Sequence, residues 1–197
     1  MKKFNEFAKE LEEAATDIVY HGTSLSRAIE ILSTDKFRLS DAKGSWSDDT
    51  DTEINQKQGK DKRYYLSTAR SATSPYINDL DTMIDSTTAD VLFVIDGRKI
   101  SHNHRTKAVD YGRGEYASDY GNELEDRVFS KKPVIDNASK YIKEAHVWKK
   151  FSSSSSHGES ILEKFLSQAK RKGIRVWVYD NQRDWQSMNK KRAVFTQ

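Results

Sequence analysis

The alternation of apolar and polar positions divides the first part of the chain into two helices and a strand. Apolar side chains recur at helical spacing within residues 3–16, which predicts an amphipathic helix. The apolar run 18–20 predicts a short buried strand. A second helix is expected to end near Thr34, and the oxygen of Thr23 or Ser24 would cap its beginning.

The next part of the chain has an interruption between predicted strands. Residues 37–40 suit a short strand, after which residues 41–62 lose all periodicity and carry many acidic and amide side chains. A stretch of this length without secondary structure is usually functional or disordered, so we expect a flexible loop. A strand over 64–68 and a helix over about 70–84 should follow it.

The most apolar segment of the chain lies at 90–96 and predicts a strand buried on both faces. Asp96 and Gly97 should turn the chain at its end, and residues 101–121 are polar enough to be irregular. A strand is expected over 123–129. Its polar start and apolar end would place carboxylates at the mouth of a cleft.

The last third of the chain predicts one more alternation of elements. A strand over 141–148 leads through a serine-rich linker at 152–156 to a helix over 159–172. Gly173 stops that helix, and a strand over 174–179 and a basic tail from residue 185 complete the chain. The mixture of helices and strands predicts an α+β fold.

Composition narrows the classes of protein that the chain can represent. At 197 residues it suits a single domain, and a net charge of +3 with 32% charged residues gives no overall bias toward nucleic acid. The chain has no cysteine, which excludes a disulfide framework, a thiolate nucleophile and a thiolate zinc site. With no signal-like apolar segment near Met1 and no run that could span a membrane, we expect a cytoplasmic protein.

The stretch from Val19 to Ser24 carries the first candidate chemistry. It delivers His21 and Gly22 together at the end of a strand, just before a helix begins. Glycine allows a ligand to approach the main chain where a Cβ would block it, so the pair suits a polar ligand held against backbone. The alternative is a strand-to-helix turn in which the histidine is simply packed.

Two later segments accompany the histidine and glycine in a fixed order. One is Arg63-Tyr64-Tyr65-Leu66-Ser67-Thr68-Ala69-Arg70-Ser71, and the other is Gly121-Asn122-Glu123-Leu124-Glu125-Asp126-Arg127-Val128. Together the three segments resemble the ADP-ribosyltransferases over about residues 18–130. The likeness is to the His-Tyr-Glu branch, which includes diphtheria-toxin-like and poly(ADP-ribose)-polymerase-like domains and small phage and bacterial relatives.

That resemblance implies a fold, a substrate and a reaction. The fold would be a split pair of small antiparallel sheets around an NAD cleft, flanked by helices, within one domain over residues 1–197. The protein would transfer a single ADP-ribose from NAD to a protein or a nucleic acid, without a metal, as a toxin-like phage or bacterial effector. The alternative is a noncatalytic protein on the same fold that binds ADP-ribose or nucleic acid.

The resemblance also assigns catalytic roles to the acidic pair. Cleavage of nicotinamide from NAD develops positive charge on the ribose, which a well-placed carboxylate can stabilise. Glu125 is expected to hold the ribose hydroxyl, and Glu123 to position or activate the acceptor. The alternative is an edge strand whose exposed acidic side chains pair with Arg127 or a lysine. Glu123 also remains a rival for the catalytic role, because Asn122-Glu123-Leu124 resembles the polymerase-like string around the catalytic glutamate.

Three residues at the first strand would contact the NAD. By resemblance, His21 would donate to the adenosine-side ribose and the main chain of Gly22 would bind the nicotinamide amide, with Thr23 beside them. The nicotinamide ring would lie between Tyr65 and Tyr76, since aromatic stacking of that kind is worth about 0.5–1.5 kcal/mol.

The strand and turn after the loop complete the expected NAD site. Tyr64 should point to the opposite face of the strand from Tyr65, since neighbouring strand residues alternate. Ser67 is expected in the cleft, although a Ser-Thr strand end and a Glu-x-Glu pair are commoner in the Arg-Ser-Glu branch. Arg70 would bind the pyrophosphate from the start of a helix, and a surface ion pair is its alternative role.

Two further patterns are weaker. His102 and His104 have metal-ligand spacing, but no third ligand follows, which favours a solvated loop. The basic part 157–197 contains cations near Trp177 that suit nucleic-acid phosphates and stacking. Cations near a helix C-terminus are also favoured by the helix dipole, and Trp177 itself suits the core.

Overall fold

The computed structural model describes residues 16–41, 64–72, 91–109, 125–149 and 156–196. The helix expected over 3–16, the loop over 41–62 and the helix over 70–84 therefore fall largely outside the described residues. Two candidate site residues, Tyr76 and Glu123, also lie outside them.

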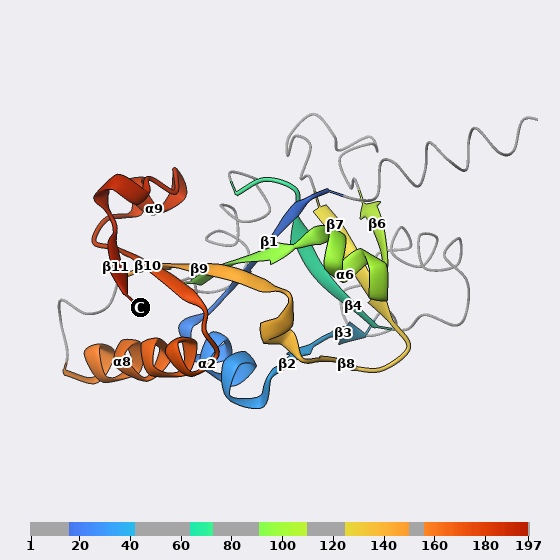
Figure 1. Cartoon of the computed structure of the whole chain (residues 1–197), viewed down its shortest axis with the longest axis horizontal. Helices are drawn as coiled ribbons and strands as arrows, with labels where there is room; N and C mark the ends of the chain where they lie inside the picture. Colours follow the sequence, from blue (N-terminus) through green and yellow to red (C-terminus); the bar gives the residue numbers. More distant parts are fainter. Residues whose placement is uncertain (1–15, 42–63, 73–90, 110–124, 150–155, 197) are drawn as a thin grey trace, which may run out of the picture.

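Most described strands form one large, mainly antiparallel sheet (Figure 1). From one edge to the other it runs β11 (Val194–Thr196), β10 (Arg175–Tyr179), β9 (Ile142–Trp148), β5 (Val91–Asp96), β1 (Ile18–Thr23), β4 (Tyr64–Ala69), β7 (Glu125–Ser130) and β6 (Arg105–Val109). The short β3 (Ser40–Asp41) pairs with β4, and β2 (Lys36–Arg38) forms a separate ribbon with β8 (Val134–Asp136).

The sheet narrows to a single pair of residues between β1 and β4. β1 pairs with β5 at all six of its positions, but with β4 only through Tyr20 and Ala69. On the far side of this junction, β7 pairs with β4 at all six of its positions and with β6 at five of them. The mixed, mainly antiparallel architecture agrees with the expected fold class. Apart from the β2–β8 ribbon, however, the described strands bond into one nine-stranded sheet, whose two parts are joined at this junction by one residue pair.

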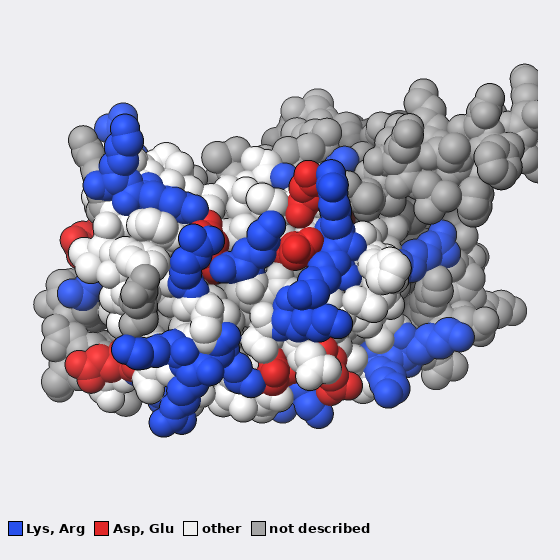
Figure 2. All heavy atoms as spheres, viewed as in Figure 1, with Lys and Arg blue, Asp and Glu red and all other residues white. Residues whose placement is uncertain are grey.

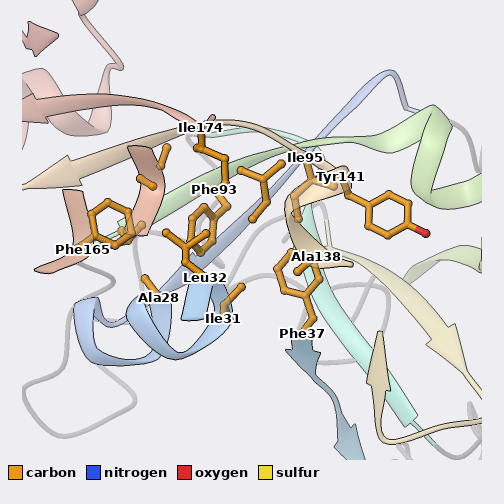
Figure 3. Close-up of a cluster of buried hydrophobic side chains, with 14 of the residues drawn as sticks. Ala28, Ile31, Leu32, Phe37, Phe93, Ile95, Ala138, Tyr141, Phe165 and Ile174 are labelled. Atoms are coloured by element: carbon orange, nitrogen blue, oxygen red, sulfur yellow. The ribbon is translucent and has the colours of Figure 1, made fainter. Parts of the chain in front are cut away.

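Two helices cover one face of the larger half of the sheet (Figure 1). They are α2 (Leu25–Thr34) and α8 (Ser156–Arg171), and α8 makes the crossover between the parallel strands β9 and β10. Apolar positions of both helices pack against alternate residues of the strands, as Phe165 does against Phe93 (Figure 3). Burial of this apolar surface is the main stabilising contribution to the fold.

The opposite face of the same half carries a smaller cluster. Trp185 from α9 (Gln182–Gln186) is buried there and stacks on Trp148, with ring centroids 6.1 Å apart. Leu92, Ala69 and Tyr179 are buried in the same cluster. A basic tail was expected from residue 185. Instead, α9, the 3-10 turn Lys190–Arg192 and β11 close this end of the sheet.

The prediction of a turn at Asp96 is wrong, because a helix begins there. The Asp96 carboxylate accepts a hydrogen bond from the Lys99 main-chain N–H and caps α6 (Gly97–Asn103). A Cβ at Gly97 would collide with the main-chain oxygen of Thr16, so glycine is required at this position. The strand β6 follows α6, where an irregular stretch was expected.

Two expected boundaries also change around the candidate site. β1 continues through Gly22 to Thr23, and Ser24, whose side chain accepts from the Arg27 N–H, is the cap of α2. Residues 70–72 form a bend and a turn, so Arg70 does not begin a helix. Within the described ranges, every helix is too short or too polar to cross a lipid bilayer.

Candidate active site

His21 connects β1 to β4 just beyond the point where their main-chain pairing stops. Its Nδ1 lies 2.9 Å from the main-chain oxygen of Ser67. A carbonyl oxygen can only accept, so Nδ1 carries the hydrogen and donates it. The side chain of His21 therefore continues the contact between the strands after the single Tyr20–Ala69 pair.

The surroundings of His21 favour its neutral form. The ring meets Phe37 edge to face, with centroids 5.9 Å apart. Burial lowers the pKa of His21 below its usual value, a shift that the Ser67 hydrogen bond opposes and the charge of Arg27 reinforces. In a neutral ring with hydrogen on Nδ1, the other nitrogen, Nε2, is a hydrogen-bond acceptor.

Glu125 is the first residue of β7 and lies directly opposite Ala69 of β4. Its side chain is only 3% exposed. The Ser67 hydroxyl donates to Glu125 Oε1 at 2.8 Å, and Arg127 Nε donates to the same oxygen at 3.1 Å. Of the alternative role, the pairing of Glu125 with Arg127 is present, but β7 lies between β4 and β6 and is not an edge strand. The carboxylate is also buried rather than exposed at the mouth of a cleft.

A row of polar and aromatic side chains extends from Glu125 along this face. The register pairs Ser67 with Arg127 and Tyr65 with Phe129, which places Tyr65, Ser67, Glu125 and Arg127 on one face of the two strands. The Arg127 guanidinium lies 4.2 Å from the centroid of the Tyr65 ring. Arg127 thus contacts both the carboxylate and the aromatic ring.

Tyr64 lies on the other face of β4, together with Leu66 and Thr68. Asp126, almost fully buried, is on the same face of β7, and the Arg70 Nε lies 3.3 Å from its carboxylate. The Thr68 hydroxyl donates to the main-chain oxygen of Asp126. Arg70 thus has a partner within the protein, although 22% of its side chain is still exposed.

The remaining candidate residues on β1 lie within the strand. Gly22 pairs with Leu92 and Thr23 pairs with Val91 of β5. Thr23 is buried, whereas Gly22 is partly exposed. In an antiparallel strand, alternate residues direct their main-chain groups toward opposite neighbours, so part of the β1 main chain beyond Tyr20 faces the side of β4 without pairing to it.

A second polar cluster lies on β9 and β10. The buried carboxylate of Glu144 accepts from Lys190 and Trp177 and contacts His146 Nε2 at 3.2 Å. Burial raises the pKa of Glu144, but these hydrogen bonds outweigh it and lower the pKa to about 2. Burial lowers the pKa of His146 to about 4, so its ring is neutral and Nδ1 accepts from the Tyr179 hydroxyl at 2.7 Å.

Sequence reasoning missed this cluster. The available signal was the alternation of Glu144 and His146 on one face of an otherwise apolar strand. The position of Lys190, which lies 46 residues further along the chain from Glu144, could not be read from any local pattern.

The described residues contain no group of three or more histidine or acidic side chains that could hold a metal ion. His102 is exposed, and His104 packs edge to face on Tyr141 with centroids 6.1 Å apart. Burial lowers the pKa of His104. These two histidines therefore have separate surroundings.

The basic C-terminal part is partly neutralised by the protein itself. Lys172 pairs with Asp35, and Lys190 and Arg175 pair with Glu144. Figure 2 shows Lys and Arg side chains over much of the viewed face, with Asp and Glu between them. Trp177 is partly buried, packs against the smaller apolar cluster and contacts Phe195.

A hollow of about 230 Å³ lies away from Glu125, between α8, β10 and β11. It is lined by Leu166, Ser167, Lys170, Ile174, Val176 and Thr196, mostly through apolar surface. None of the candidate NAD-binding or catalytic residues contributes to it.

Comparisons with known proteins give one structural likeness. No family model matches the chain, and no curated protein matches its sequence. A solved structure of Thermus sp. 2.9 DarT in complex with ADP-ribosylated ssDNA is similar, with 12% identity and a TM-score of 0.47. The alignment covers 79% of this chain and 90% of that chain. A likeness of this degree does not assign the chain to a family.

Proposed function

We propose that the protein is a mono-ADP-ribosyltransferase that cleaves NAD and transfers ADP-ribose to a macromolecule. One observation carries the proposal. The carboxylate of Glu125 is buried at the start of a strand that lies between two others, and Ser67 and Arg127 hold it through Oε1, next to the junction that His21 bridges. Of these residues, the first resembling segment contributes His21, the second Ser67, and the third both Glu125 and Arg127.

The held carboxylate suits the charge that develops in this reaction. Loss of nicotinamide leaves positive charge on the ribose, and a fixed negative charge stabilises such a state without having to reorganise. Both hydrogen bonds described for Glu125 use Oε1. In the proposed complex, Oε2 accepts from the 2′-hydroxyl of that ribose.

The β1 side of the junction would bind the rest of the NAD. Because Nδ1 of His21 already donates to Ser67, Nε2 would accept a hydrogen bond from a hydroxyl of the adenosine-side ribose. This reverses the direction expected from the sequence. The main chain of Gly22 would bind the nicotinamide amide, and Tyr65 would stack against the nicotinamide ring.

The acceptor in this proposal is a protein or a nucleic acid. Glu123, two residues before Glu125, would orient or activate the acceptor group. Arg70, with part of its side chain exposed, would approach the NAD pyrophosphate while keeping its contact with Asp126.

The proposal is tested with the purified full-length chain and NAD. Release of free nicotinamide reports cleavage, and labelled NAD incubated with a cell lysate reports transfer. Treating the labelled product with nuclease or with protease identifies the acceptor class. Absence of both nicotinamide release and labelling would contradict the proposal.

A noncatalytic protein is the second candidate, and the Glu125–Arg127 pair is the observation that favours it. A buried ion pair can serve fold specificity alone. Such a protein would bind ADP-ribose or a nucleic acid without releasing nicotinamide. Calorimetric titration with ADP-ribose and with a single-stranded oligonucleotide, beside the nicotinamide assay, separates the two functions.

A further inference from the structure

We propose that Arg127 is a positioning residue that fixes the carboxylate of Glu125 for the reaction proposed above, on which this inference rests. Arg127 lies two residues after Glu125 on β7, so the two side chains project from the same face of the strand. Their side chains are 6% and 3% exposed. The resemblance gives Arg127 no role in the reaction, and the sequence suggested it only as a partner in an exposed ion pair.

Both described contacts of the Glu125 carboxylate are made by one of its two oxygens. Arg127 Nε and the Ser67 hydroxyl approach Oε1 at 3.1 and 2.8 Å, from the same strand and from the neighbouring strand. Two donors on one oxygen restrict rotation of the carboxylate about its last bond. The orientation of Oε2 is then set by these two side chains.

Glu125 and Arg127 form a buried pair of opposite charges. Burying a carboxylate costs much free energy unless a cation is paired with it, and Arg127 is that cation. A buried pair is often no more stabilising than apolar residues of the same volume. Fold stability alone therefore gives a weak reason for burying an ion pair on β7. A carboxylate that must face a cationic ribose during the reaction gives a specific reason for one.

Arg127 also contacts the ring of Tyr65. The guanidinium lies 4.2 Å from the centre of that ring while its Nε contacts Glu125. A planar guanidinium can stack and donate in a fixed direction at the same time, which a lysine ammonium cannot do. Arg127 thus contacts both the carboxylate and the aromatic ring that is proposed to hold nicotinamide.

The test compares the steady-state rates at which two variants of Arg127 release nicotinamide. Arg127→Lys keeps the positive charge but removes the planar guanidinium group, and Arg127→Met removes the charge while keeping a side chain of similar length. We expect kcat to fall about 10-fold in the first and about 10²-fold in the second, since misplacement by about 1 Å costs rates of that order. The KM for NAD should change by less than about twofold, because the residue acts on orientation in the reacting state.

A matched control separates positioning from loss of stability. Val128 is fully buried on the opposite face of β7, so Val128→Ala destabilises the same strand without reaching Glu125. All variants are assayed below their melting temperatures and corrected for the fraction that binds NAD. We expect the kcat of Val128→Ala, corrected in this way, to equal that of the wild type.

Each outcome decides the inference. If both Arg127 variants keep the wild-type kcat, Arg127 has only a structural role and the inference is wrong. The same holds if the corrected kcat of both variants falls no further than that of Val128→Ala. Should Arg127→Met fail to fold, the kcat and KM of Arg127→Lys decide it alone. If the wild type itself releases no nicotinamide, the proposed function fails, and the inference fails with it.

Discussion

The Nδ1–H of His21 donates to the main-chain oxygen of Ser67 across the point where β1 and β4 part. Main-chain pairing between these strands is limited to Tyr20 and Ala69. One side chain therefore joins the strand that carries the first sequence motif to the strand that carries the second. Ser67 in turn donates through its hydroxyl to Glu125, the residue from the third motif.

Substitutions of His21 should separate its structural contact from NAD binding. Asparagine can reproduce the Nδ1–H donation to Ser67 through its amide, but it has no group at the position of Nε2. His21→Asn should melt close to the wild type and bind NAD about 3–10-fold more weakly, the value of one hydrogen bond. His21→Ala should lose both stability and affinity. Calorimetric NAD titrations and thermal melts measure the two effects, and unchanged NAD affinity in both variants would remove His21 from the site.

The two adjacent tyrosines should behave differently because they lie on opposite faces of β4. Tyr65→Ala should weaken NAD binding by about 2–10-fold, corresponding to the loss of aromatic stacking. Tyr64→Ala should mainly lower the melting temperature. The same titrations and melts apply, and the reverse pattern would show that the NAD site uses the other face of the strand.

The protein should become less stable at low pH because His146 becomes protonated. In the folded protein burial lowers the pKa of His146 to about 4, whereas the unfolded value is close to 6.5. The contribution of the neutral ring is therefore complete above about pH 6.5 and is lost progressively as the pH falls toward 4. The free energy of unfolding should decrease on the order of 2–3 kcal/mol over that window.

A variant of His146 identifies the source of this pH dependence. His146→Gln retains a donor for Glu144 and an acceptor for Tyr179 but does not titrate. Its unfolding free energy, measured by urea denaturation from pH 7 to pH 4, should be flatter than that of the wild type. An equal slope in both proteins would assign the acid sensitivity to another group.

The elements with strong local patterns were predictable from the sequence. β5 is a continuous apolar run, α2 and α8 carry apolar positions at helical spacing, and their boundaries agree with expectation within a few residues. α6 was missed because Ile100 is its one large buried side chain, which gives no periodic pattern. β11 was missed since Val194 and Phe195 are exposed, and pairing with β10 alone makes the segment a strand.

The candidate site was predictable only in part, for a similar reason. The order of motifs identified His21, Ser67 and Glu125, and strand alternation put Tyr65 rather than Tyr64 with them. Arg127 could be named only as a partner in an exposed ion pair, because burial of β7 depends on β4 and β6, which lie far away in the chain. The single pair between β1 and β4 is likewise a tertiary feature that no local pattern encodes.

The role of the Glu125 carboxylate is tested most directly by the rate at which Glu125→Gln releases nicotinamide at saturating NAD. Glutamine keeps the size of the side chain and an oxygen that can accept from Ser67 and Arg127, but it removes the negative charge. The exposed helix residue Glu163, changed to glutamine, is the matched control. We expect a fall of about 10²-fold or more for Glu125→Gln with NAD affinity near wild type, and none for Glu163→Gln. A folded Glu125→Gln variant that releases nicotinamide at the wild-type rate would contradict the assignment of Glu125 and the mechanism built on it.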